Sequence, residues 1–344
     1  GSVVVPVALA LGEARDAALD RVGAAIVVGY EVAARLGAAA GRGFHARGFH
    51  ATSVVGPLAA AAAASRFLGL DGERLASAFG LAGSMSGGLL EFAAEGTWSK
   101  WLHPGWAAQG GITAAALAAR GFRGPGTVLE GRFGLYRSFL GGETPVAALA
   151  DGLGTLWQGE GALFKHYPCA HVVQPYVDAA LALGAAHGIA AAEVASVRCG
   201  IAAWAVPIVC EPRARKIAPA NDMEAIASLP YQLAAALVDG GVDLDTLSPR
   251  RLARAPVRAL AARVNHVVDP ALGHGFDGTL EITLADGTVH RARAASPPPD
   301  PARVVAKFRA NAGAALSAAA LARIEALADP PWEGGVRELL GALR

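Results

Sequence analysis

Residues 22 to 39, VGAAIVVGYEVAARLGAA, are apolar around the whole circumference of a helix, with Glu31 and Arg35 as the charged exceptions. A helix of this kind is buried on most of its faces, because it has no polar stripe to turn toward water. The same helical spacing continues from residue 3 to about residue 122, with breaks at glycine-rich turns. Because alanine and glycine let helices approach closely, this half of the chain is predicted to be a tightly packed helix assembly.

The pattern changes from about residue 163. VASVRCGIAAWAVPIV at 194–209 is β-branched and extended, and GTLEITLADGTVHRARA at 278–294 is two alternating runs joined by Asp286-Gly287, a strong hairpin signal. SPPPDPA at 296–302 indicates a linker, after which helical spacing returns. The sequence therefore predicts a mostly α fold with an α+β part, made of a large helical domain and a smaller α/β domain.

The composition excludes several classes of partner. The 344 residues are 53% hydrophobic and 17% charged with a net charge of +1, so no global field attracts nucleic acid. The longest apolar run, VVGPLAAAAAA, is too short to span a bilayer, and membrane binding is not expected. The three cysteines, Cys169, Cys199 and Cys210, are widely spaced and odd in number, which indicates a reducing compartment. With no signal peptide, we expect a cytoplasmic protein.

Several phrases that follow one another along the chain carry a resemblance. They are GYEVAARLG, GFHATSVVGPLAAAAAASRFLGLDGERLASAFGLAGSMSGGL, EGTWSKWLHPGWAAQGG, GPGTVLEGRFGLYRSF, FKHYPCAH, SLPYQLAAALVDG and VVAKF. Taken together, over nearly the whole chain, they resemble the MmgE/PrpD family, which includes 2-methylcitrate dehydratase, cis-aconitate decarboxylase and iminodisuccinate epimerase.

The resemblance implies an architecture and a substrate class. It implies a helical domain from residues 1–160 and 298–344, an α/β lid domain from residues 161–297, and a homodimer with the active site in the cleft. It also implies action on small di- and tricarboxylic acids without an iron–sulfur cluster or redox cofactor, so no cofactor is expected. Family members carry a helical segment before the position of Ser2 that holds part of the catalytic apparatus. We therefore expect the catalytic set of this chain to be incomplete and its turnover weak.

His50 is the first candidate for the chemistry. Removing a proton next to a carboxylate creates a dianionic enolate, so the site needs cations and a base of near-neutral pKa. His50 precedes ATSVVGP, where Thr52 or Ser53 can cap a helix whose N–H groups favour an anion, and these two residues are predicted substrate contacts. His50 matches the family histidine of GFHxT, which implies an acid/base or carboxylate-binding role. The alternative is a turn histidine bonded to a carbonyl, and His45, without such a match, is interpreted as loop surface.

Lys100 is the second candidate. It lies in TWSKWLHPG between Trp98 and Trp101, where apolar neighbours would desolvate the ammonium and strengthen its hold on a carboxylate. The family has a functional lysine at the matching place, which implies a catalytic role. The alternative is a lysine whose stem covers tryptophan. His103, three residues later, is a substrate-binding candidate that shares the site if this stretch is helical.

The stretch FKHYPCAH supplies two further candidates. Lys165 matches a second family lysine, which implies that it enters the cleft from the lid side, and His171 is a predicted substrate contact. The alternative for Lys165 is an exposed loop residue before a proline-fixed turn. Many family members have a Thr-His pair where this chain has Val173-Gln174, so the substrate stays open. Cys169 is interpreted as a small packed side chain rather than a nucleophile.

Other motifs are weaker. His45 and His50 lack the spacing of a zinc pair, so no metal site is predicted. GLAGSMSGG lacks the lysine of a phosphate loop, and its glycines are interpreted as helix-packing residues. The cluster Arg213, Arg215 and Lys216 is most simply a solvated loop, and the alternative is that it meets an anionic substrate near the lid.

The sequence thus predicts a cofactor-independent lyase, a dehydratase or decarboxylase of a small di- or tricarboxylic acid such as 2-methylcitrate or aconitate. His50 is the predicted acid/base, and Lys100 and Lys165 are the predicted carboxylate clamps. One alternative is an epimerase or isomerase of a dicarboxylic acid, which would share the removal of the α-proton. Another is a truncated, inactive homologue that acts as a binding protein.

Overall fold

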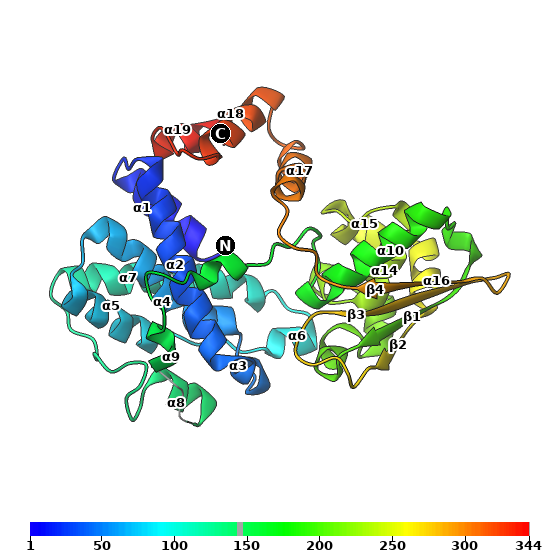
Figure 1. Cartoon of the computed structure of the whole chain (residues 1–344), viewed down its shortest axis with the longest axis horizontal. Helices are drawn as coiled ribbons and strands as arrows, with labels where there is room; N and C mark the ends of the chain where they lie inside the picture. The colour runs from blue at the N-terminus through cyan, green and yellow to red at the C-terminus, as the bar shows by residue number, and fades with distance from the viewer. Residues whose placement is uncertain (143–146, 344) are drawn as a thin grey trace. The chain divides into compact units, whose positions relative to one another are not determined.

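The computed structural model describes residues 1–142 and 147–343, which form two compact units (Figure 1). The first unit comprises Gly1–Ala162 and Ala312–Arg344, and the second comprises Leu163–Asn311. Residues 298–311, which the sequence assigns to the helical domain, thus cluster with the second unit. The predicted fold class, mostly α with an α+β part, is confirmed.

Helices build the first unit. They are α1 (Val4–Ala14), α2 (Leu19–Ala40), α3 (Gly43–Ala46), α4 (Ala51–Leu68), α5 (Gly72–Ser84), α6 (Glu91–Glu95), α7 (Ser99–Ala119), α8 (Leu135–Leu140), α9 (Ala147–Ala150), η1 (Gln158–Gly161), α18 (Ala318–Ala328) and α19 (Val336–Ala342).

Helix α4 is the centre of this unit, and it packs closely against α7. A methyl group added to Gly111 of α7 would lie 2.3 Å from the Cβ of Ala60, and one added to Gly56 of α4 would lie 2.8 Å from the Cβ of Ala107. The two backbones therefore approach closely because their contacting residues are glycine and alanine. This confirms the tight helix packing predicted from composition.

Two helices of the described chain, α2 and α4, are long and apolar enough to cross a membrane by length and composition alone. In the sequence, the uninterrupted apolar run within α4 is short, and α2 carries the charged residues Glu31 and Arg35. Of the apolar window, 78% is buried inside the structure for α4 and 39% for α2. Burial among neighbouring helices therefore accounts for most of the apolar surface of α4.

The chain's last helices pack on its first ones. Leu327 of α18 and Val336 of α19 share an apolar cluster with Leu19 and Val22 of α2. The ring of Trp332 lies directly on Gly23 of α2, where an added Cβ would be 1.8 Å from the indole.

A buried ion pair on α2 binds backbone groups of the segment 149–159. Arg35 donates to Glu31 at 2.5 Å and to the carbonyl oxygens of Leu149, Asp151 and Leu156 at 2.8 to 2.9 Å. Glu31 also accepts the N–H of Gly159 at 2.9 Å. Burial would raise the pKa of Glu31, but the Gly159 and Arg35 hydrogen bonds lower it below its ordinary value.

The second unit mixes helices and strands. Its elements are η2 (His171–Val173), α10 (Gln174–His187), η3 (Ala191–Glu193), β1 (Val194–Ile201), η4 (Ala203–Ala205), α11 (Val206–Val209), α12 (Arg213–Ile217), α13 (Asp222–Ile226), α14 (Leu229–Asp239), η5 (Asp245–Leu247), α15 (Pro249–Leu252), α16 (Ala255–Ala261), β2 (Val264–Val268), β3 (Gly278–Leu284), β4 (Val289–Ala294) and α17 (Pro301–Ala312).

The four strands form one mixed sheet in the order β2-β1-β3-β4, in which only the β1–β2 pair is parallel. Helices α10 and α14 contact the sheet, as Figure 1 shows. The predicted hairpin at Asp286-Gly287 is confirmed, with Gly287 at φ +88°. The predicted extended run 194–209 is confirmed for residues 194–201 and wrong for the rest. The strand ends at Ile201 and helical turns follow, since Pro207 lacks the N–H that a strand would pair.

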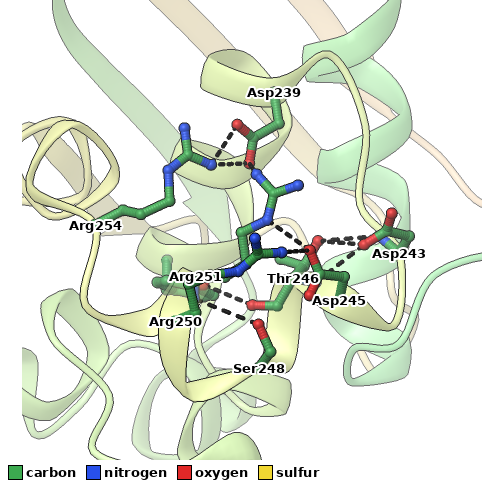
Figure 2. A network of polar contacts seen from close by, with 9 residues as sticks. Asp239, Asp243, Asp245, Thr246, Ser248, Arg250, Arg251 and Arg254 are labelled. Carbon is green, nitrogen blue, oxygen red and sulfur yellow. Dashed lines mark hydrogen bonds and ion pairs between the residues drawn. The ribbon is translucent and has the colours of Figure 1, made fainter.

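Figure 2 shows a polar network that ties the end of α14 to α15 and α16. Asp239 accepts from Arg254 at 2.5 and 2.8 Å, and Asp245 accepts from Arg250 at 3.0 Å and from Arg251 at 2.8 Å. The carboxylates thereby hold the turn between these helices.

The predicted solvated loop at 213–216 is wrong. These residues form α12, and Lys216 is buried there with its Nζ 2.7 Å from the carbonyl oxygens of Ile208 and Ala227. Burial lowers the pKa of Lys216 to about 8. Arg213 donates to the Val264 carbonyl and Arg215 to Glu224, so the cluster is structural because buried carbonyls and a carboxylate need its donors.

Candidate functional site

His50 is held at the start of α4 by a short antiparallel contact. Its N–H donates to the carbonyl oxygen of Gly88 at 3.0 Å, and the N–H of Leu90 donates to that of Gly48 at 2.9 Å. Gly88 has a φ of +97°, and a methyl group there would lie 2.6 Å from the Oγ of Ser53. Only glycine fits this turn, which fixes the backbone of His50 against α4.

The N-terminus of α4 differs from the prediction. The helix begins at Ala51 with His50 as its N-cap residue, so Thr52 and Ser53 lie inside the first turn and do not cap it. The backbone N–H groups of Ser53 and Val54 donate to the His50 carbonyl at 2.8 and 3.2 Å. The N–H groups of Ala51 and Thr52 come before the first hydrogen bond within the helix. N–H groups in this position point out of the helix N-terminus, where they stabilise an anion.

His103 comes beside His50 from α7. This helix begins at Ser99, so the helical spacing that would place Lys100 and His103 on one face is confirmed. The Nδ1 atoms of His50 and His103 are 2.9 Å apart, and His103 is only 9% exposed. The buried ring of Phe92 lies against both, with centroids 5.6 Å from His50 and 5.7 Å from His103. Phe92 was not found by sequence reasoning, because nothing in the sequence relates α6 to α7 in space.

Charge in this group is disfavoured by burial. Burial, and then the positive charge of Lys100, lower the pKa of His103 below its ordinary value, and burial also lowers the pKa of Lys100. The Nζ of Lys100 is 5.7 Å from the Trp101 ring centroid. Trp98 and Trp101 are themselves 69% and 53% exposed, so they do not enclose the ammonium as the sequence suggested. Contact with Trp101 also fits the alternative of a lysine stem that covers tryptophan.

In the second unit, the side chain of Gln174 shapes the stretch that carries Lys165 and His171. The amide of Gln174 accepts the N–H groups of His166 and Tyr167 at 2.9 and 3.0 Å, and it donates to the Tyr167 carbonyl at 2.8 Å. Gln174 is 6% exposed. Sequence reasoning noted it only as a departure from the family, whereas an amide that opens a helix after an irregular stretch was the available signal.

Helix α17 adds two polar contacts to the same stretch. Lys307 donates to the carbonyl oxygen of Lys165 at 2.6 Å, and Arg303 donates to Asp178 at 2.7 Å. Tyr167 donates to the same carboxylate oxygen of Asp178 at 2.7 Å. Lys165 is half-buried rather than an exposed loop residue.

His171 lies in the same stretch, at the start of η2. Burial, and then the positive charge of Lys165, lower its pKa to about 4. With His166, Gln174 and residues 296–299, it lines a cavity of about 20 Å³, which has room for one water but not for a tricarboxylic acid. Cys169 is 1% exposed and burial raises its pKa to about 12, which agrees with a packed thiol.

The structure thus brings His50, Thr52, Ser53, Lys100 and His103 to the start of α4 and α7 in the first unit. Lys165 and His171 lie in the second unit. His45 is an exposed residue of α3, with its ring centroid 6.5 Å from that of His50. Among residues 1–142 and 147–343, no three histidine, cysteine or carboxylate side chains gather as they would around a metal ion.

Comparison with known proteins gives matches over both units. The profile of the MmgE/PrpD N-terminal domain matches residues 1–148, and that of the MmgE/PrpD C-terminal domain matches residues 167–329. Human cis-aconitate decarboxylase is 31% identical over 282 residues, which is 78% of this chain and 57% of the human protein. The mouse protein of the same name is 31% identical over 279 residues, and that of Aspergillus terreus is 31% identical over 162 residues. The chain spans just over half the length of the human and mouse relatives.

Proposed function

The chain belongs to the MmgE/PrpD family, and on that premise we propose that it is a cofactor-independent lyase for a small di- or tricarboxylic acid. The proposed reaction is dehydration or decarboxylation, with 2-methylcitrate or cis-aconitate as representative substrates. The observation that carries the proposal is the group of His50, His103 and Lys100 at the first turn of α4.

Carboxylate binding is the first requirement of this chemistry. The first-turn N–H groups of α4 stabilise an anion, and Lys100 adds a full positive charge three residues from His103. Because burial partly desolvates Lys100, its attraction for a carboxylate is stronger than that of a lysine in water. We propose Lys100 as the carboxylate clamp and Thr52 and Ser53 as contacts of the same anion.

Proton transfer is the second requirement. We propose that His50 removes the proton next to the bound carboxylate, since an imidazole is the side chain whose pKa lies nearest to neutrality. The electron pair left on carbon is delocalised into the carboxylate, whose growing charge Lys100 and the helix N–H groups stabilise. Elimination then expels the leaving group, whereas a decarboxylase would protonate the carbon after loss of carbon dioxide.

The second unit contributes its own candidates. We propose Lys165 as a carboxylate clamp held in place by Lys307 through its carbonyl oxygen. His171, with its pKa lowered to about 4, is neutral at pH 7 and would act as a hydrogen-bonding group rather than a cation.

The test combines binding with isotope exchange. The whole chain is incubated in D₂O with cis-aconitate, 2-methylcitrate or the unreactive tricarballylate, and NMR follows deuterium entry, water loss and carbon dioxide release. We expect a ligand-dependent rise in Tm, and exchange that His50→Gln abolishes and His45→Gln retains. A Tm rise without exchange or product would contradict the lyase and leave a binding protein. Exchange without net product would indicate the epimerase, and no effect of any acid would overturn the substrate class.

A further inference from the structure

The contact between His50 and His103 is a hydrogen bond between two ring nitrogens. A separation of 2.9 Å between the two Nδ1 atoms is the length of a hydrogen bond with a nitrogen donor, and it leaves room for one hydrogen. A neutral imidazole carries its hydrogen on either Nδ1 or Nε2. When both rings are neutral, one is therefore the Nδ1–H form and the other the Nε2–H form, so the two tautomers are complementary.

We propose that His103 is the positioning partner of His50: it accepts the Nδ1–H of His50 and so leaves the lone pair of His50 on Nε2. The inference rests on the proposed function for its consequence in catalysis, but the shared proton can be measured without turnover. It replaces the expectation that His103 binds substrate directly.

The direction of the bond follows from the surroundings. His103 is 9% exposed and lies one helical turn from Lys100, so a positive charge on its ring would be both desolvated and repelled. Among the described residues, His45 of α3 is a further titratable neighbour of the pair, and it lies near Arg42. Burial and Lys100 both disfavour a charge on His103, so a single positive charge on the pair lies on His50, whose Nδ1–H then points at the Nδ1 lone pair of His103.

Packing keeps the two rings in this relation. The ring centroids of His50 and His103 are 5.1 Å apart, and Phe92 lies edge-on to both. On the other side, a methyl group on Gly88 would be 3.2 Å from the Cε1 of His103. His103 therefore has little room to turn away from His50.

The bond defines how His50 acts as a base. When the substrate C–H bond breaks, its electron pair stays on carbon and the proton bonds to Nε2 of His50. The resulting imidazolium keeps its Nδ1–H bonded to the neutral His103, which stabilises the new charge. A second proton would set two N–H groups against each other at 2.9 Å, so the pair holds at most one positive charge.

The first test observes the hydrogen bond directly. The whole chain is labelled with ¹⁵N-histidine, and spectra near pH 7 report the tautomer of each ring, with signals assigned from His50→Gln and His103→Gln. We expect His50 as the Nδ1–H form, His103 as the Nε2–H form, and a scalar coupling between the two Nδ1 nuclei. His45→Gln, which removes a neighbouring ring outside the bond, should keep the coupling. Two Nε2–H rings, the opposite assignment, or no coupling would overturn the inference.

The second test separates positioning from structure. His103→Leu removes the acceptor, whereas His103→Gln keeps an acceptor oxygen of similar reach. We expect His103→Leu to lower kcat by about tenfold to a hundredfold with little change in KM, and His103→Gln to restore part of it. Without an acceptor for its Nδ1–H, the imidazolium of His50 is destabilised, so the acidic limb of kcat/KM should move to lower pH. An equal loss of kcat in both variants, with no shift of the acidic limb of kcat/KM, would overturn the positioning role.

Absence of turnover in the unaltered chain would count against the lyase, and the NMR result would still decide the inference.

Discussion

At the scale of single residues, Lys100 offers a test of charge against packing. We expect Lys100→Met to weaken the binding of tricarballylate by about tenfold to a hundredfold, because a hydrogen bond to a charged group is lost, while the apolar stem is kept. Calorimetric titration measures the affinity, and thermal unfolding measures the stability.

A matched control for Lys100 is Arg132→Met in the same unit. Arg132 also lies near an aromatic ring, 4.5 Å from the Phe133 centroid, but it is exposed and lies outside α4 and α7. The Arg132→Met substitution should leave the affinity for tricarballylate unchanged. If Lys100→Met lowered the Tm strongly and kept the affinity, the stem on Trp101 would be its main role.

His171 predicts a pH dependence of the stability of the second unit. Its pKa is about 4 in the folded state against about 6.5 in an unfolded chain. Between these values the unfolded state binds more protons, so stability should fall as the pH falls from about 6.5 to about 4, by about 1 to 2 kcal/mol because solvent screens this partly exposed ring. Urea unfolding across this range, compared with His171→Gln, measures the effect. The exposed His274→Gln should follow the unaltered chain, and an unchanged slope in His171→Gln would contradict the prediction.

Single residues show where sequence reasoning succeeds and where it stops. The proximity of Lys100 and His103 was predictable, because helical spacing within α7 determines it. The bond between His50 and His103 was not, because it depends on how α4 packs on α7. Gln174 and Phe92 were missed for the same reason, since their contacts reach residues of other segments and carry no local pattern.

At the scale of secondary-structure elements, the buried ion pair on α2 should contribute more to the free energy of unfolding than the ion pairs of Figure 2. Arg35→Leu leaves the carboxylate of Glu31 and three carbonyl oxygens without their donor, and we expect a loss of about 3 to 5 kcal/mol in the free energy of unfolding. Arg254→Leu in the more exposed network should cost about 1 kcal/mol or less. Chemical denaturation measures both, and equal losses would be inconsistent with this ranking.

Two glycines of α7 should respond in opposite directions to the same change. Gly111→Ala places a methyl group 2.3 Å from the Cβ of Ala60, so α4 and α7 must separate, which should cost about 1 to 3 kcal/mol. Gly105→Ala meets open space among the described residues and should stabilise the helix by about 0.5 to 1 kcal/mol. The free energies of unfolding from chemical denaturation decide, and a shift of the same sign for both would contradict the packing argument.

Among the elements, those with a local cause were predictable. The hairpin of β3 and β4 follows from Asp286-Gly287, and the helices of the first unit follow from apolar spacing. The run 194–209 was predictable only to Ile201, because apolar β-branched residues suit a strand and a buried helical turn alike. The start of α4 was misplaced because His50, rather than Thr52 or Ser53, ends the extended backbone.

At the scale of the whole molecule, the change from helical to extended sequence patterns near residue 163 predicted two parts, and the structure divides the chain after Ala162. The second boundary was harder to place. SPPPDPA looks like the border of a domain, yet α17, which follows it, keeps Arg303 and Lys307 bonded to Asp178 and to Lys165. Two polar contacts to a distant segment decide the boundary, and no local feature of the sequence reports them.

The last prediction is that the chain is a homodimer, which we propose from its composition and its family. Large apolar side chains remain exposed on the described surface, among them Leu89, Trp98, Leu102 and Trp106 near the candidate site in the sequence. With 17% charged residues, there is little polar surface to compensate for them, and exposed apolar area of this kind marks an interaction surface. Sedimentation at micromolar concentration should give the dimer mass. Because apolar contacts hold it, sulfate should strengthen the dimer, whereas an assembly held by charges would dissociate as salt is added. A monomer at every concentration, or dissociation in sulfate, would contradict the prediction.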